Sequence, residues 1–329
     1  MQRLMGRRAE RKEPSRHQGL GRRAAIAGGL CLCCTPLAKL RAEEKWDALP
    51  CNEVAPGLFV TRGLNEEAAA NNADAIANQA FVIGQNAVAV IDPGGSRAHG
   101  AALRAAIRAR TDKPIRYVII THVHPDHCFG AGAFLEDKPV FLGHARLIPA
   151  LEARGAYYQR GLIQILGKDA TGPIVLPTET VAKDMTLDLG NRPLSLHAHG
   201  PAHTDNDLSV IDTRTNTLLS GDLLFVQRMP TLDGSLKGWL AELAELKQIS
   251  FARAVPGHGP QAVRWPDAAA DLERYLNLLV TETRAAVRQN IGIDAAVATV
   301  AQSERGKWIL FDAYHGRNVT EVYKELEWE

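Results

Sequence analysis

A short polar stretch directly after an apolar run carries side chains that can bind metal ions. Within six residues it supplies three histidines and one aspartate: His122, His124, Asp126 and His127. Imidazole and carboxylate are ligands of zinc and related divalent ions, and a loop at a strand end can aim them at one point. Pro125 disfavours helix at His124, so the first two histidines are expected in extended backbone with both rings on one side, and Asp126 is expected to begin the next helix. Four such groups are hard to explain as packing, so the stretch predicts a metal site.

Three further candidate ligands lie later in the chain, each in a loop that follows a predicted strand. His203 lies in the sequence Ala-His-Thr, Asp222 in Ser-Gly-Asp, and His258 in Pro-Gly-His-Gly. Taken singly, each would more often be structural than functional. Because all three follow strands, as the first stretch does, we interpret them together as the rest of one metal-binding constellation.

The elements that must position these residues alternate between short strands and helices. In the first half the predicted strands are 58–60, 80–83, 87–91 and 117–120, with a helix at 96–110. In the second half they are 174–176, 185–189, 194–197, 208–211, 217–220 and 253–255, with helices at 236–249, 266–289, 293–302 and 318–327. Residues 143–168 are expected to be a helical or irregular insertion. Two β-rich halves with helices outside predict a layered sandwich.

The four motifs, in this order, resemble those of the metallo-β-lactamase-fold superfamily, and the resemblance covers about residues 56–280. It implies an α+β fold, a four-layer αβ/βα sandwich, formed by residues 43–329 as one domain with C-terminal helices and with the metals at the edge between the halves. It also implies a ligand assignment for two zinc ions per chain. His122, His124 and His203 would bind one ion, Asp126, His127 and His258 the other, and Asp222 would bridge them.

Such a ligand set predicts metal-assisted hydrolysis of a small molecule. Two zinc ions lower the pKa of a shared water toward neutrality, and the resulting hydroxide can attack an ester, thioester, lactone or amide-like substrate. Asp126 is the candidate catalytic residue, because it could orient the hydroxide or carry a proton to the leaving group. Asp92 is expected either to hold the ligand loops from behind or only to cap a turn. Relatives that hydrolyse antibiotics include classes with cysteine at the position of Asp222, and the aspartate lowers the expectation of dedicated penicillin hydrolysis.

Substrate-side residues are less well defined by the sequence. Tyr157, Tyr158, Phe225 and Arg228 lie in segments that flank the metals in this fold and are candidates for the pocket lining. An arginine there would favour an anionic substrate group, although surface arginines are common. Cys128 is expected to be a small buried hydrophobe rather than a ligand.

Two other function classes remain open. Persulfide dioxygenases share the fold and bind one iron through positions that match His122, His203 and Asp222. A non-catalytic binding protein for a redox cofactor is the other alternative. The complete second set of ligands, with His127 and His258, favours two zinc ions over one iron.

The N-terminus differs in charge from the rest of the chain. Residues 1–24 carry eight basic and two acidic side chains, and the remainder carries 30 basic and 35 acidic ones, which gives no reason to expect nucleic-acid binding. The apolar segment 24–38 is too short to span a membrane and predicts a cleavable export signal at 1–42, either twin-arginine-like through Arg22 and Arg23 or of the general secretory type, and hence a periplasmic protein. A cytosolic helix with a basic arm is the alternative. After cleavage only Cys51 and Cys128 would remain, and whether they pair is left open.

The C-terminal stretch 308–329 resembles the end of exported zinc metallohydrolases that occur with periplasmic quinoprotein dehydrogenases. This resemblance implies a periplasmic accessory hydrolase with a functional link to such a dehydrogenase. Its aromatic residues are expected to belong to a helix that packs on the body of the protein: Trp308, Phe311 and Tyr314.

Overall fold

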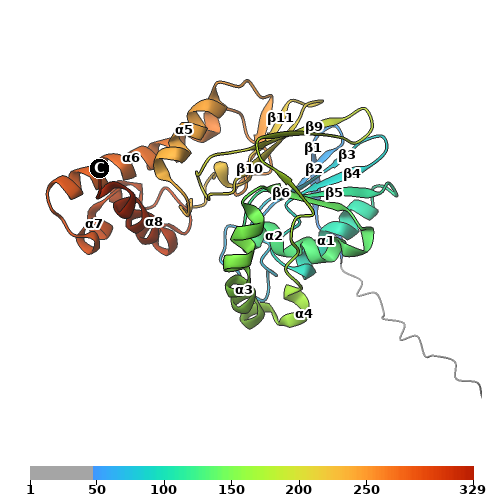
Figure 1. The fold of residues 1–329 in the computed structure, drawn as a ribbon, viewed down its shortest axis with the longest axis horizontal. Helices are drawn as coiled ribbons and strands as arrows, with labels where there is room; N and C mark the ends of the chain where they lie inside the picture. Colours follow the sequence, from blue (N-terminus) through green and yellow to red (C-terminus); the bar gives the residue numbers. More distant parts are fainter. Residues whose placement is uncertain (1–46) are drawn as a thin grey trace, which may run out of the picture. The chain divides into compact units, whose positions relative to one another are not determined.

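Two β-sheets form the centre of the protein in the computed structural model, which describes residues 47–329 (Figure 1). The first sheet has seven strands in sequential order: Cys51–Ala55 (β1), Leu58–Thr61 (β2), Gln79–Ile83 (β3), Val88–Ile91 (β4), Ile115–Ile120 (β5), Val140–His144 (β6) and Glu179–Val181 (β7). The second has five, in the order β12-β11-β10-β9-β8: Asp184–Asp188 (β8), Pro193–Ala198 (β9), Leu208–Asp212 (β10), Thr217–Leu219 (β11) and Arg253–Val255 (β12). The predicted export signal 1–42 lies outside the described residues.

Helices cover the outer face of each sheet. On the first sheet lie Arg97–Arg108 (α1), Pro125–Cys128 (α2), a 3-10 helix at Phe129–Asp137, Leu147–Leu166 (α3) and Lys168–Thr171 (α4). On the side of the second sheet, Leu236–Lys247 (α5) and Ala270–Arg288 (α6) form the helical layer. Phe311–Leu326 (α8) packs on α6, and Ile293–Thr299 (α7) packs on α8, farther from the strands. None of the helices in residues 47–329 is long and apolar enough to cross a membrane.

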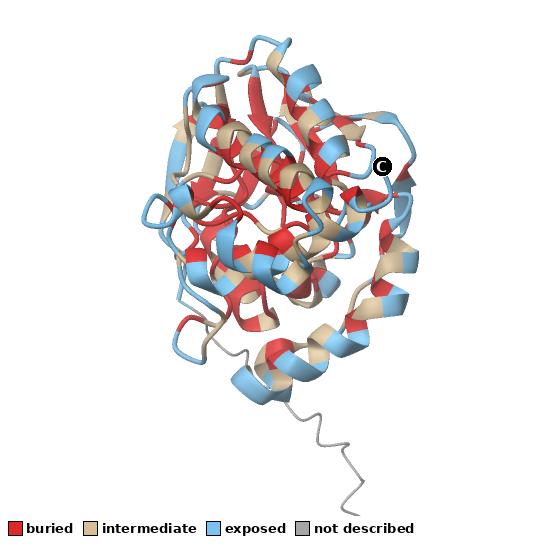
Figure 2. Cartoon of the chain, turned by 90° about the vertical axis from the view of Figure 1, so that its left-hand side faces the viewer, coloured by how far each residue is buried: buried red, intermediate tan, exposed pale blue. Residues whose placement is uncertain are grey.

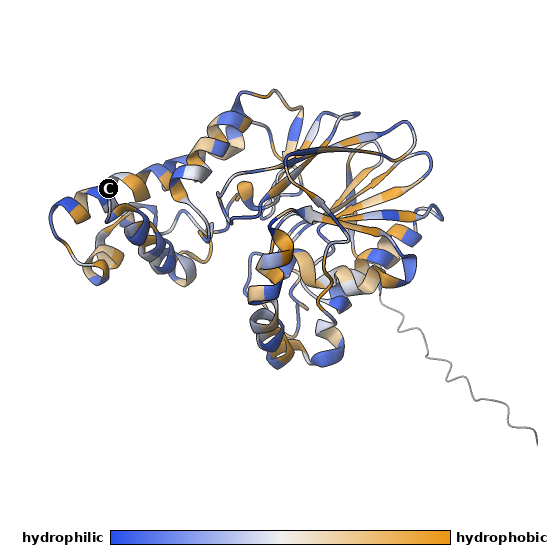
Figure 3. Cartoon of the chain, in the orientation of Figure 1, coloured by the Kyte–Doolittle hydropathy of each residue, from blue (hydrophilic) through white to orange (hydrophobic). Residues whose placement is uncertain are grey.

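Three apolar cores separate the four layers. One lies between the sheets, where Leu58 and Val82 of the first sheet face Leu196 and Val210 of the second. Another fills the space between the first sheet and its helices, and the third the space between the second sheet and its helices. The strands are accordingly apolar (Figure 3), and the helices bury the side that faces the sheets while exposing the other (Figure 2). The predicted α+β four-layer sandwich is confirmed.

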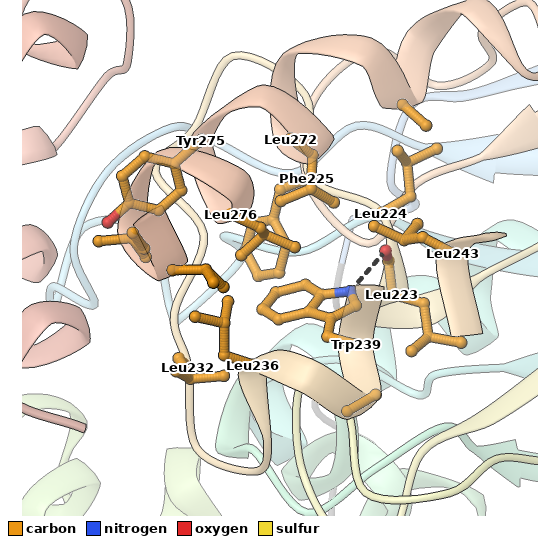
Figure 4. Close-up of a cluster of buried hydrophobic side chains, with 14 of the residues drawn as sticks. Leu223, Leu224, Phe225, Leu232, Leu236, Trp239, Leu243, Leu272, Tyr275 and Leu276 are labelled. Carbon is orange, nitrogen blue, oxygen red and sulfur yellow. Dashed lines mark hydrogen bonds between the residues drawn. The ribbon is translucent and has the colours of Figure 1, made fainter. Parts of the chain in front are cut away.

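Trp239 of α5 is the centre of the third core (Figure 4). Its indole is fully buried among leucines and Phe225, and its Nε1–H donates to the carbonyl of Leu223 at 3.0 Å. Since Leu223 follows Asp222 directly, this bond connects the helical layer to a candidate metal ligand.

The sequence located most elements within a few residues. The strand predicted at 174–176 is wrong, because the pairing strand is β7, which begins at Glu179. Strands β1 and β6 were not predicted, and α8 begins at Phe311 rather than at 318. The insertion at 143–168 is mostly the helix α3. Cys51 and Cys128 are both free thiols.

A buried ion pair joins the two sheets. Arg192, in the turn between β8 and β9, donates to both carboxylate oxygens of Asp212, with Nη2 at 2.6 Å and Nε at 3.3 Å. Its Nη1 donates to the carbonyl of Ile83 in the first sheet at 3.1 Å. Gly57 makes room for the guanidinium, since a Cβ there would lie 2.3 Å from Nη1. Neither charged side chain is exposed by more than 2 %.

We expect Arg192→Met to lower the free energy of unfolding by about 3–5 kcal/mol, because it leaves the Asp212 carboxylate buried without a positive charge, with only the hydroxyl of Thr215 as a side-chain donor. Adding Asp212→Leu should recover part of the loss, whereas Lys324→Ala, which breaks only an exposed pair with Glu321, should cost about 1 kcal/mol or less. Urea unfolding measures all three variants. A cost for Arg192→Met no larger than that of Lys324→Ala would contradict a structural role for the pair.

Candidate metal centre

Seven candidate ligands reach one edge of the sandwich from the segments that follow four strands. His122 and His124 follow β5, with Asp126 and His127 in the first turns of α2. The other three lie on loops of the second sheet: His203 between β9 and β10, Asp222 in the turn after β11, and His258 after β12. The structure therefore brings together all seven residues that the sequence singled out. They form two groups, and within each group the ligand atoms lie within 4.8 Å of one another.

The first group contains three imidazoles and one carboxylate: His122, His124, His203 and Asp222. The Nδ1 atom of His124 lies 3.1 Å from Nε2 of His122 and 2.9 Å from Nε2 of His203. The Oδ2 atom of Asp222 is 3.7 Å from Nε2 of His122 and 3.4 Å from Nε2 of His203. These four atoms converge as the ligands of a tetrahedral metal ion do.

The second group is formed by Asp126, His127 and His258. The Oδ2 atom of Asp126 lies 3.3 Å from Nε2 of His258 and 3.7 Å from Nε2 of His127. Asp222 also reaches this group, with Oδ1 at 3.1 Å from His127 and Oδ2 at 3.4 Å from His258. Asp222 is thus within ligand distance of both groups, as a bridging carboxylate would be.

Two buried atoms in this centre have no hydrogen-bond partner, namely Nε2 of His127 and Oδ1 of Asp222. They lie 3.1 Å apart, and burial without a partner is costly for both. A shared cation would satisfy both atoms, so the donor set fits a pair of divalent metal ions.

Burial and mutual charge set the protonation of the ligands. Burial lowers the pKa of His203 to about 3 and, with the nearby His127, holds that of His122 well below its usual value. Burial alone would raise the pKa of Asp126 and of Asp222, but His127 and His258 together outweigh it and keep both below their usual values. The neutral His122 and His203 and the two ionised carboxylates are in the states that bind metal ions. The nearby carboxylates raise the pKa of His127 and of His258 despite burial, so metal binding must release protons from these two rings.

Asp92 holds the second group from behind. Its Oδ2 accepts a hydrogen bond from Nδ1 of His127 at 2.7 Å, and both of its oxygens accept from Thr121, which precedes His122. Its backbone has a φ of 56°, a conformation that aspartate and asparagine tolerate better than most residues. This arrangement orients His127 through Nδ1 and leaves Nε2 to face the metal position.

The other histidines are oriented by partners outside the motifs. Nδ1 of His203 donates to the carbonyl of Thr231 at 2.7 Å, and Nδ1 of His258 to that of Ile76 at 2.9 Å. Nε2 of His124 lies 3.2 Å from Oδ2 of Asp233. The sequence analysis did not find Asp233, because it lies 109 positions from its partner in a loop without a recognisable motif.

The candidate pocket residues differ in position. Tyr158 of α3 is half-buried, with its ring centroid 6.4 Å from that of His124, and the neighbouring Tyr157 is 69 % exposed. Phe225 is buried against the ligands, stacked on His258 with ring centroids 4.9 Å apart. Arg228 is also buried.

The guanidinium of Arg228 has partners within the protein. It donates to the carbonyl of Glu66 at 2.6 Å and to the hydroxyl of Tyr314 at 3.0 Å. Cys128 is buried as well, its Sγ lies 3.5 Å from the carbonyl of Val123, and burial raises the pKa of its thiol well above the usual value. Phe225 thus packs directly on a candidate ligand, and the polar atoms of Arg228 and Cys128 bond to other residues within the protein.

The sequence model of the metallo-beta-lactamase superfamily matches residues 74–258, more than half of the chain and the segment that spans all seven candidate ligands. The chain belongs to the metallo-beta-lactamase superfamily. Among curated members, a linear primary-alkylsulfatase from Pseudomonas sp. is 22% identical over 207 residues, which are 52% of this chain and 39% of that protein. The uncharacterized protein YobT of Bacillus subtilis is 25% identical over 129 residues, or 38% of this chain and 53% of that protein. The chain thus matches about half or less of the length of these relatives.

Solved structures of the superfamily show the same fold. A metallo-beta-lactamase from Pontibacter korlensis is 17% identical, with a TM-score of 0.57 over 70% of this chain and 99% of that one. The sec-alkylsulfatase Pisa1 from Pseudomonas sp. is 18% identical, with a TM-score of 0.65 over 84% of this chain and 50% of that one. At these identities the likeness establishes the superfamily fold.

We expect Asp92→Asn to weaken metal binding about 10- to 100-fold at the group that contains His127, because an amide has one acceptor oxygen and its NH2 group would face either Nδ1 of His127 or the backbone N–H of Thr121. Titration of the metal-free protein against a chromophoric chelator measures the affinity, and circular dichroism tests whether the fold is kept. Unchanged affinity in a folded Asp92→Asn variant would show that Asp92 only shapes its turn.

Proposed function

We propose that this protein is a hydrolase with a dinuclear zinc centre that acts on a small molecule with an ester, thioester, lactone or amide-like bond. The observation that supports this most directly is the position of the Asp222 carboxylate within 3.7 Å of ligand nitrogens in both groups. Two zinc ions held there would supply a hydroxide at neutral pH and polarise the bond that breaks.

The chain's own residues define where the substrate would approach. The side chains of His124 and Asp126 are each 13% exposed, whereas those of the other five ligands are exposed by 3% or less. The centre therefore opens to solvent between His124 and Asp126, beside Tyr158. Asp126 is ionised, because neighbouring imidazoles keep its pKa low, and it can accept a hydrogen bond from an attacking water or orient it.

The substrate class is proposed from the centre and from the relatives together. One relative is named a linear primary-alkylsulfatase and one neighbouring structure a sec-alkylsulfatase, so an alkyl sulfate belongs among the substrates to be tested. An iron dioxygenase would need only His122, His203 and Asp222, and a non-catalytic binding protein would need no metal ligands. Neither function requires the buried second group. The complete second group favours hydrolysis by two metal ions.

Protein purified without added metal is expected to contain about two zinc ions per chain and to hydrolyse at least one member of a panel of alkyl sulfates, thioesters, lactones, phosphoesters and β-lactams. A chelator should abolish the activity and zinc should restore it. His258→Ala should lower kcat/KM by at least about 100-fold, whereas His197→Ala, which removes an exposed histidine paired with Asp184, should leave it unchanged. One iron per chain with oxygen uptake on glutathione persulfide would overturn the proposal.

We also propose that residues 1–42 export the protein to the periplasm, where it would serve as an accessory hydrolase linked to a quinoprotein dehydrogenase. The basic and then apolar composition of the leader supports export, and the resemblance of residues 308–329 supports the link.

Expression of the full chain in a Gram-negative host should yield a periplasmic product that begins near residue 43, as measured by fractionation and N-terminal mass spectrometry. If the twin-arginine route is used, Arg22→Lys with Arg23→Lys should retain the precursor in the cytoplasm, whereas the control Arg7→Lys with Arg8→Lys should not. Continued export of the first variant would assign the general secretory route, and a cytoplasmic full-length wild type would contradict export.

A further inference from the structure

One loop of the second half holds two of the candidate metal ligands. We call residues 229–235 the ligand loop, because the carbonyl of Thr231 accepts from His203 and the carboxylate of Asp233 faces His124. The loop backbone is also bonded to the His203 segment, with the amide of Asp233 donating to the carbonyl of His203 at 2.8 Å. Both ligands oriented by this loop belong to the first group.

The ligand loop has no regular secondary structure of its own, and α8 holds it on both sides of Thr231. Oδ1 of Asn318 accepts from the amide of Leu232 at 2.9 Å, and Nδ2 of Asn318 donates to the carbonyl of Pro230 at 2.7 Å. Asn318 is 1% exposed, and Leu232 is buried in the core shown in Figure 4. One side chain of α8 therefore fixes the peptide group that carries the carbonyl bonded to His203, together with the peptide group before it.

Two further contacts connect α8 to the same loop. Nη2 of Arg317 donates to Oδ1 of Asp233 at 2.9 Å, so the carboxylate that orients His124 is held by α8 at Oδ1, while Arg154 of α3 donates to Oδ2. At the end of the loop, the hydroxyl of Ser235 donates to Oε1 of Glu325 at 2.8 Å. The three residues of α8 thus bond to the loop along its length.

The second group is oriented from elsewhere. His127 is bonded to Asp92, which follows β4, and His258 to the carbonyl of Ile76, which precedes β3. Among the described residues, no hydrogen bond of these two rings runs to the ligand loop or to α8. His122 of the first group shares this framework, because its Nδ1 lies 3.0 Å from the hydroxyl of Thr121, which donates to Asp92. The ligand loop therefore supplies outer contacts to His124 and His203 of the first group and to neither histidine of the second.

We propose that α8 is a positioning element for the first metal group, and that Arg317 and Asn318 set the metal affinity of that group through the ligand loop. The inference rests on the proposed dinuclear centre. Helix α8 lies outside residues 74–258, so the contacts of Arg317 and Asn318 are made from beyond the segment that matches the superfamily model. Outer contacts of ligating histidines change metal affinity by about 10- to 100-fold, which makes the effect measurable.

The test measures metal binding at each group separately, in two variants that each retain only one intact group. His258→Ala disables the second group and leaves the first, whereas His203→Ala disables the first and leaves the second. In each background the metal-free full chain, with Arg317→Ala, Asn318→Ala or no further change, is titrated with zinc against a chromophoric chelator. Lys324→Ala is the matched control, because it removes an exposed cation of α8 that pairs only with Glu321.

We expect Arg317→Ala to weaken zinc binding about tenfold in the His258→Ala background and less than twofold in the His203→Ala background. Arg317→Lys should restore part of the affinity, because a cation again faces Asp233. Arg317 is half exposed, so the unfolding midpoint of the metal-free variant should match that of Lys324→Ala and exclude general unfolding. If Asn318→Ala does not fold, Arg317→Ala decides the test alone.

Equal loss in both backgrounds, or no loss in either, would overturn the positioning role of α8. Failure of the unmodified chain to bind two zinc ions would overturn the proposed dinuclear centre instead, and the inference with it. The two failures are distinguishable, because the first appears only in the α8 variants and the second already in the wild type.

Discussion

The carboxylate of Asp222 is the group on which the rest of the centre depends. It is 3% exposed and lies within ligand distance of four imidazoles from both candidate groups. A buried carboxylate is costly unless positive charge and hydrogen bonds compensate it, and the apolar cores around it cannot do so. Compensation comes from histidines on loops of both sheets, which requires the sheets to meet at this edge. The three cores, the Arg192 ion pair and the helical layers hold the sheets in that arrangement.

Hydrogen bonds to groups that are not themselves candidate ligands determine which nitrogen of a histidine faces the centre. Carbonyl groups accept from His203 and His258, and carboxylates accept from His124 and His127. A carboxylate partner makes the ring a stronger ligand than a neutral carbonyl does. Each group thus has at least one carboxylate-held ring. The source of the contact differs, since Asp92 belongs to the strand framework of the first sheet and Asp233 to a loop held by α8.

The sequence identified the seven residues that the structure brings together, because each lies in a short local motif at a strand end, where residue types and spacing carry the information. It failed where structure depends on contacts between distant segments. Residues 174–176 are apolar enough for a strand, but prolines at 173 and 177 bound them and the pairing begins only at Glu179. Strand β6 contains Gly143 and was missed, although its neighbours on both sides bury it. Asp233 and Asn318 have no local signal, since only the packing of α8 against the ligand loop gives them a role.

The orientation of His124 shows how such distant contacts determine which nitrogen faces the centre. Burial alone would raise the pKa of Asp233, but the hydrogen bond from His124 and the guanidinium groups of Arg154 and Arg317 keep it below its usual value. An ionised carboxylate can only accept hydrogen bonds, so His124 must donate through Nε2 and present the lone pair of Nδ1 to the other histidines. Arg154 belongs to α3 on the first sheet and Arg317 to α8 on the second. The metal-facing atom of His124 is therefore determined by charges from two helices that meet only in the folded protein.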